Sequence, residues 1–87
     1  MFWGVIMANF KKEFEFKIVE RISTISEKTE SWPLELNLVS FNGEEPKYDL
    51  RRWNKSHTRM GRGTTLTLGE LKALTMSIED YLEESGL

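Results

Sequence analysis

Apolar and polar residues alternate along most of this chain, and only one segment shows helical spacing instead. The alternation runs through 13–26 and returns at 34–39 and 47–53, and a short segment at 63–66 is also expected to be extended. A period of two is typical of strands, and the loss of phase late in 13–26 predicts a bulge or bend in that strand. The Asn-Gly pair at 42–43 tolerates positive φ and predicts a hairpin turn.

One helix is predicted after the strands. Thr67 and Glu70 have the spacing of a capping box, and Gly86 is placed as a stop, so the helix should run from Leu68 to about Ser85. Four apolar residues recur there at helical spacing: Leu71, Leu74, Ile78 and Leu82. The sequence therefore predicts an α+β fold (β-β-β-β-α), in which a four-stranded antiparallel curved β-sheet precedes one C-terminal α-helix. That helix is expected to cover one face of the sheet and leave the other free.

The length of 87 residues allows one domain. We expect residues 13–87 to form it, with 1–12 as an N-terminal extension that is either disordered or follows a misassigned start, since Met7 offers a second start. A chain this small usually needs a disulfide, a metal or a partner subunit, and it contains no cysteine. This favours an oligomer, and a reducing cytoplasm is its expected location.

The net charge of −2 hides a separation of charges along the sequence. The charged residues between 46 and 63 are all basic except Asp49. The charged residues after Gly69 are mostly acidic. Because a local field steers a polyanion, the basic half keeps nucleic acid among the expected partners. Its cations are Lys47, Arg51, Arg52, Lys55, Arg59 and Arg62.

The strand at 47–53 is expected to separate two kinds of side chain. Tyr48 and Leu50 should face the helix, while the free face receives Lys47, Asp49, Arg51 and Trp53, with Phe41 beside them. An aromatic platform with interleaved cations suits a single strand, since each base stacks for about 1–3 kcal/mol and cations hold phosphates. The alternative is a half-buried Trp53 at a strand end and a merely solvated set of cations; the pattern leaves both open.

Two stretches, 39–53 and 61–66, resemble the transcriptional positive coactivator four C-terminal domain family, and its compact bacterial branch in particular. The specific parts are Lys-Tyr-Asp-Leu-Arg-x-Trp and Met-Gly-Arg-Gly-x-x-Leu, and the resemblance extends from about Phe14 to Leu82. It implies a homodimer through the C-terminal helices, with channels that bind single-stranded DNA largely independently of sequence, in a coactivator-like or general role in transcription, replication or repair. No catalysis and no cofactor are implied.

Site residues follow from the resemblance by position. Phe41 and Trp53 would stack on bases, and Lys47, Arg51 and Arg62 would hold phosphates, with Arg52, Lys55 and Arg59 as looser matches. The dimer interface would contain Leu71, Leu74, Met76, Ile78, Tyr81 and Leu82.

Other functions remain open at this stage. The runner-up is a dimeric protein-interaction adaptor of transcription or repair proteins, and RNA is an alternative to DNA. His57 has no second histidine and no nearby carboxylate in the sequence, so it is expected to be a solvated loop residue rather than a catalytic base or metal ligand. A membrane partner is disfavoured because the polar face of the helix is acidic. We expect a nucleoid-associated cytoplasmic protein and no enzyme.

Overall fold

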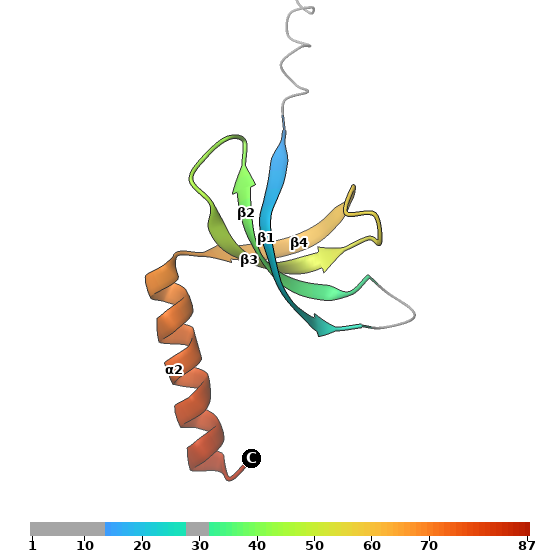
Figure 1. Ribbon diagram of the computed structural model, residues 1–87. Helices are drawn as coiled ribbons and strands as arrows, with labels where there is room; N and C mark the ends of the chain where they lie inside the picture. Colours follow the sequence, from blue (N-terminus) through green and yellow to red (C-terminus); the bar gives the residue numbers. More distant parts are fainter. Residues whose placement is uncertain (1–13, 28–31) are drawn as a thin grey trace, which may run out of the picture.

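The computed structural model describes residues 14–27 and 32–87 and contains four strands followed by one helix (Figure 1). The elements are β1 (Phe16–Ser26), β2 (Leu34–Phe41), β3 (Lys47–Trp53), β4 (Met60–Leu66) and α2 (Leu68–Ser85). The strands form one antiparallel sheet in the order β1-β2-β3-β4. The predicted fold class is confirmed, while the prediction for residues 1–12 lies outside the described part of the chain.

Two strands start at other residues than predicted: β1 begins at Phe16 rather than at residue 13, and β4 also differs. It begins at Met60 rather than at residue 63, because Met60 pairs with Trp53 across a bulge in the β3–β4 ladder. Glycines such as Gly61 give no strand signal in a sequence, so this early start was not visible there. β2 also continues to Phe41, two residues beyond the predicted segment.

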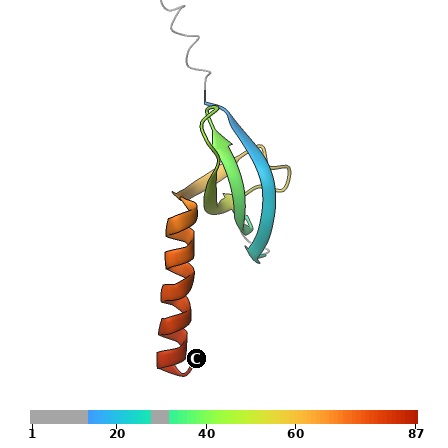
Figure 2. The same cartoon turned by 60° about the vertical axis from the view of Figure 1, so that its left-hand side comes forward.

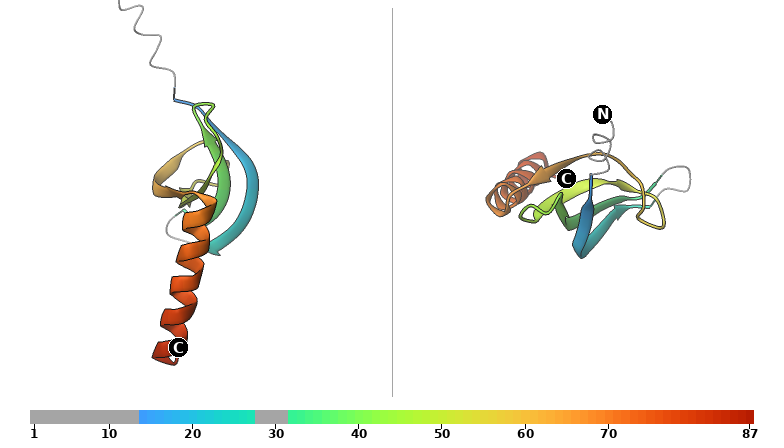
Figure 3. Two further views of the ribbon diagram at one scale, coloured as in Figure 1. Left: turned by 90° about the vertical axis from the view of Figure 1, so that its left-hand side faces the viewer. Right: turned by 90° about the horizontal axis from the view of Figure 1, so that it is seen from above.

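β1 is irregular, as its broken alternation predicted. Its pairing with β2 shifts register three times, between Ile18 and Glu20, between Arg21 and Ser23, and between Thr24 and Ser26. Each bulge adds a residue to β1 alone and increases the local twist. The sheet therefore curls, and Figures 2 and 3 show β1 and β2 bending together as an arc.

The local signals for the turn and the helix are confirmed. Asn42 and Gly43 have φ values of 55° and 77° in the β2–β3 turn. The Thr67 side chain accepts a hydrogen bond from the Glu70 amide at 3.1 Å, and the Glu70 carboxylate accepts one from the Thr67 amide at 2.9 Å. Gly86 ends α2 with a φ of 72°.

The helix does not cover a sheet face, and this prediction is wrong. None of its residues is buried, and it contacts the sheet only through β3 and β4. Figure 1 and the left view of Figure 3 show α2 projecting away from the strands. Only Thr67 lies between β4 and α2, so the chain has no loop with which to turn the helix back onto the sheet.

The two sheet faces separate as the alternation predicted, but their burial is the reverse of the expectation. The inner face of the curl contains the buried residues, which are Glu35, Asn37, Val39, Asp49 and Trp53. The leucines of β2 and Leu50 of β3 lie on the outer face and are only half-buried. Because the sheet curls, the side chains on its inner face shield one another from water. The outer face stays open because α2 does not cover it.

Among the described residues, no helix combines the length and the apolar character needed to cross a membrane.

Candidate nucleic-acid interface

Strand pairing gathers the candidate binding residues on the inner face. Asn37 pairs with both Arg21 and Asp49, and Glu35 pairs with Arg51, so these side chains share one side of the sheet. Phe41 pairs with Phe16 at the other end of β2. The predicted combination of aromatic and cationic side chains on one face is therefore present.

An aromatic and cationic column lies at one end of the inner face. The Phe14 and Phe41 rings are stacked with centroids 6.0 Å apart at an interplanar angle of 28°. The guanidinium of Arg51 lies over the Phe41 ring, 5.0 Å from its centroid. Phe14 is 60% exposed, so the column ends in an aromatic ring that water still reaches. Phe14 was part of the alternating pattern but was not among the predicted site residues.

Arg51 is held in place by a buried carboxylate. Its Nη2 lies 2.6 Å from Asp49 Oδ1, and its Nε donates to both Asp49 oxygens at 2.7 and 2.8 Å. The Asp49 side chain is completely buried, and Arg51 Nη1 also donates to the Gly61 carbonyl at 3.3 Å. The guanidinium is therefore oriented by the protein itself, over the ring of Phe41.

Gly63 permits this arrangement. A Cβ atom at this position would collide with Arg51 Cβ and would lie 2.5 Å from the Leu50 carbonyl oxygen. Any side chain at position 63 would therefore displace Arg51 or the β3 backbone. Because Gly63 has no side chain, the Arg51 side chain can lie across β4 at this position.

Trp53 lies on the predicted face but exposes none of its surface. Its ring is 5.1 Å from the ring of Phe16 and 5.6 Å from that of His57. Within the described residues its Nε1 has no hydrogen-bond partner. A base can therefore reach this indole only after a neighbouring side chain moves.

His57 is not the solvated residue that was expected. Its Nε2 lies 2.9 and 3.1 Å from the two carboxylate oxygens of Glu35, and Arg21 Nη2 lies 3.2 Å from its Nδ1. Its φ of 58° falls in the left-handed region, which is uncommon for a residue other than glycine. The sequence did not reveal this carboxylate because Glu35 is 22 residues away.

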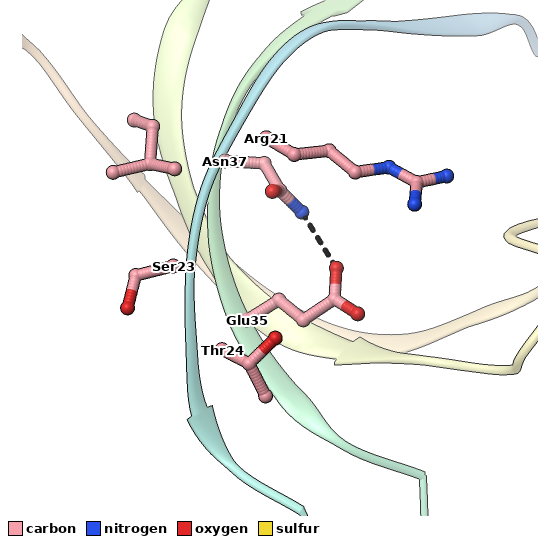
Figure 4. A pocket seen from close by; sticks show the side chains of 6 residues that line it. Arg21, Ser23, Thr24, Glu35 and Asn37 are labelled. Carbon is pink, nitrogen blue, oxygen red and sulfur yellow. Dashed lines mark hydrogen bonds between the residues drawn. The ribbon is translucent and has the colours of Figure 1, made fainter.

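Glu35 belongs to a polar cluster inside the curl. Asn37 Nδ2 donates to Glu35 Oε1 at 3.0 Å, and Figure 4 shows Arg21, Glu35 and Asn37 on the same side of the strands. A cavity of about 250 Å³ opens beside them, where β1 bulges. Burial raises the pKa of Glu35, but hydrogen bonds from Asn37 and His57 and the charge of Arg21 outweigh burial and lower that pKa below its ordinary value.

The other predicted cations are distributed around the sheet rather than along one line. Lys47, Lys55, Arg59 and Arg62 are exposed. Arg52 is half-buried, and its Nη1 donates to the Trp32 carbonyl at 2.8 Å. Arg52 and Arg62 alternate with inward-facing neighbours, so they lie on the outer side, away from Arg51.

The predicted dimer residues divide into two groups on α2. Leu71, Leu74, Ile78 and Leu82 form one stripe, and the last three are 41–47% exposed. Tyr81 flanks the stripe and is 62% exposed. At about 100° per residue, Met76 lies on the opposite side of the helix, among the acidic residues. No group of three or more metal-ligating side chains occurs in the described ranges.

The fold and this surface define a class: a small α+β domain whose curled antiparallel sheet holds aromatic, cationic and carboxylate groups on its inner face. No family model matches the chain. A protein of Treponema pallidum (strain Nichols), described as uncharacterized, is 36% identical over 74 residues, which covers 79% of this chain and 87% of that protein. The chain belongs to the same family as that protein.

Proposed function

We propose that the protein binds single-stranded DNA at the inner face of its sheet, without catalysis. The observation that carries this proposal is the column formed by Phe14, Phe41 and Arg51, which ends in an exposed aromatic ring. A base of a single strand can stack on Phe14, whereas the bases of a duplex are hidden from it. The exposed cations Lys47, Lys55 and Arg59 supply contacts to phosphates.

The resemblance to the transcriptional positive coactivator four family supports the same function, either as a transcriptional coactivator or in the general handling of exposed single strands. We propose that the protein acts in the cytoplasm, at the nucleoid. Stacking and phosphate contacts are shared by DNA and RNA, so an RNA strand of the same sequence is the natural comparison. A pair of such faces would bind a longer strand more tightly than one face does.

The second copy of the chain in the proposed homodimer covers α2 and the outer face. Val39 and Trp53 are the only apolar residues fully buried among the described ones, so one chain has a very small core. The uncovered stripe on α2 and the half-buried leucines of the outer face are where a partner adds apolar burial.

Binding is tested by fluorescence anisotropy with a labelled single strand of about twenty nucleotides and its duplex, each at two salt concentrations. We expect selective binding to the single strand, with log affinity falling by about 0.7 per phosphate contact for each unit of log salt. Phe14→Ala should weaken binding by about 1–3 kcal/mol through lost stacking. Ile25→Ala is the matched control, because Ile25 is a similarly exposed apolar residue (54%) near the far end of β1.

Two outcomes would redirect this proposal. Equal affinity for single strand and duplex would exclude base stacking as the basis of binding. No binding to either form would favour the protein-interaction adaptor instead.

The dimer has its own test. Ile78→Glu places a charge in the apolar stripe of α2 and should convert the protein to a monomer in light scattering at micromolar concentration. Met76→Glu introduces the same charge on the opposite side of the helix and should leave the dimer intact. A dimer that survives Ile78→Glu would show that α2 does not form the interface.

A further inference from the structure

The imidazole of His57 sits on the inner face much as a nucleobase would. Its ring is 5.6 Å from the Trp53 ring at an angle of 32°, and its Nε2 approaches both oxygens of Glu35. Its Nδ1 lies 3.2 Å both from Arg21 Nη2, which can only donate, and from the Lys55 carbonyl oxygen, which can only accept. The ring therefore combines an aromatic contact with one nitrogen beside a carboxylate and the other beside a guanidinium.

The groups around the His57 ring are held in fixed positions by the rest of the fold. Glu35 is ionised and fixed by the amide of Asn37 at 3.0 Å, and Trp53 is fully buried with its Nε1 unpaired in the described structure. The cavity of about 250 Å³ shares Arg21 and Glu35 with His57 and gives access beside it (Figure 4). These groups together form a ring-binding site, to which the buried Trp53 contributes its aromatic ring.

His57 belongs to a loop with its own internal support. Asn54 Oδ1 accepts hydrogen bonds from the amides of Thr58 and Arg59, each at 2.9 Å. The loop can therefore keep its shape while the side chain of His57 leaves Glu35. Departure of the imidazole would vacate the face of Trp53 and both oxygens of Glu35 together.

We propose that this site binds one guanine base of the single strand and that His57 occupies it in the free protein. Guanine has two adjacent N–H donors, at N1 and the 2-amino group, which match the two oxygens of Glu35. Its O6 accepts from Arg21, and its ring stacks on Trp53. Adenine and cytosine place an acceptor beside their amino group, and thymine flanks its single N–H with carbonyls, so none of them matches the carboxylate.

This inference rests on the proposed function and adds one base preference to otherwise sequence-independent binding. The test uses thymidine strands of about 15 nucleotides with a single central guanine, inosine, adenine or cytosine. Inosine differs from guanosine only by the missing 2-amino group. We expect the guanine strand to bind the unmodified protein about tenfold more tightly than the inosine strand.

Three variants separate base reading from support of the fold. Glu35→Gln should abolish the guanine-to-inosine ratio. His57→Gly suits the positive φ and removes the occupant, so affinity for the guanine strand should rise several-fold with the ratio retained. Lys55→Ala, on the same loop, should lower affinity for all strands alike and leave the ratio unchanged.

Equal affinity of the unmodified protein for the guanine and inosine strands would overturn the guanine site and leave single-strand binding standing. A fall in guanine affinity for His57→Gly would also overturn it, because the imidazole would then assist binding rather than compete. Absence of binding to every strand would refute the proposed function and this inference together.

Discussion

Replacing Trp53 with alanine is expected to lower the free energy of unfolding by about 3–5 kcal/mol. The side chain is fully buried, and Val39 is the only other fully buried apolar residue among those described. Removal leaves a cavity beside Phe16 and His57 that the curled strands cannot readily close. Since small domains are stable by only about 5–15 kcal/mol, urea unfolding followed by circular dichroism should show a large shift of the midpoint.

Two further substitutions show whether the loss comes from this packing. Trp53→Phe keeps an aromatic ring and removes the unpaired Nε1, so it should be much milder than alanine. Trp32→Ala removes a partly exposed indole and should shift the midpoint only slightly. If Trp53→Ala unfolded at the same urea concentration as the parent, Trp53 would not be part of the core.

Arg51→Ala is expected to destabilise the protein by about 3–5 kcal/mol, because it leaves the carboxylate of Asp49 buried without its partner. The Asp49 side chain has no exposed surface, and Arg51 contacts both of its oxygens at 2.6–2.8 Å. The loss should be measured as a lower urea midpoint at neutral pH.

The double substitution Asp49→Asn with Arg51→Ala provides the control for this pair. It removes the buried charge as well as its partner and should recover a substantial part of the stability lost in Arg51→Ala. Arg62→Ala removes an exposed arginine and should change stability by no more than about 0.5 kcal/mol. A full loss in the double variant would mean that packing by Arg51, and not its charge, stabilises β3.

Both residues also affect how a binding experiment is interpreted. The resemblance assigns base stacking to Trp53 and phosphate contact to Arg51, yet each supports the fold in the free protein. Weaker binding by either alanine variant would therefore combine two effects. Phe14 avoids this ambiguity, because 60% of its surface is exposed and its ring stacks on that of Phe41 at the end of the column.

The strand period, the Asn-Gly turn and the capping box could all be predicted because each depends on neighbours a few residues apart. The split of β3 into two faces follows from the same period. It correctly grouped Phe41 with Arg51 and Trp53, which the structure places on the inner face. The hydrogen bond between Asn37 and Glu35 on the same face was not foreseen.

By itself, the sequence determined the order of four strands and one helix, the ends of α2 and the membership of each sheet face. The tertiary structure alone decided which face is buried, where α2 points and which residues meet across the curl. Three bulges in β1 curl the sheet, and the single residue between β4 and α2 prevents the helix from folding back. The pairs Phe14–Phe41 and Glu35–His57 meet across 27 and 22 residues of chain, a separation that no local periodicity encodes.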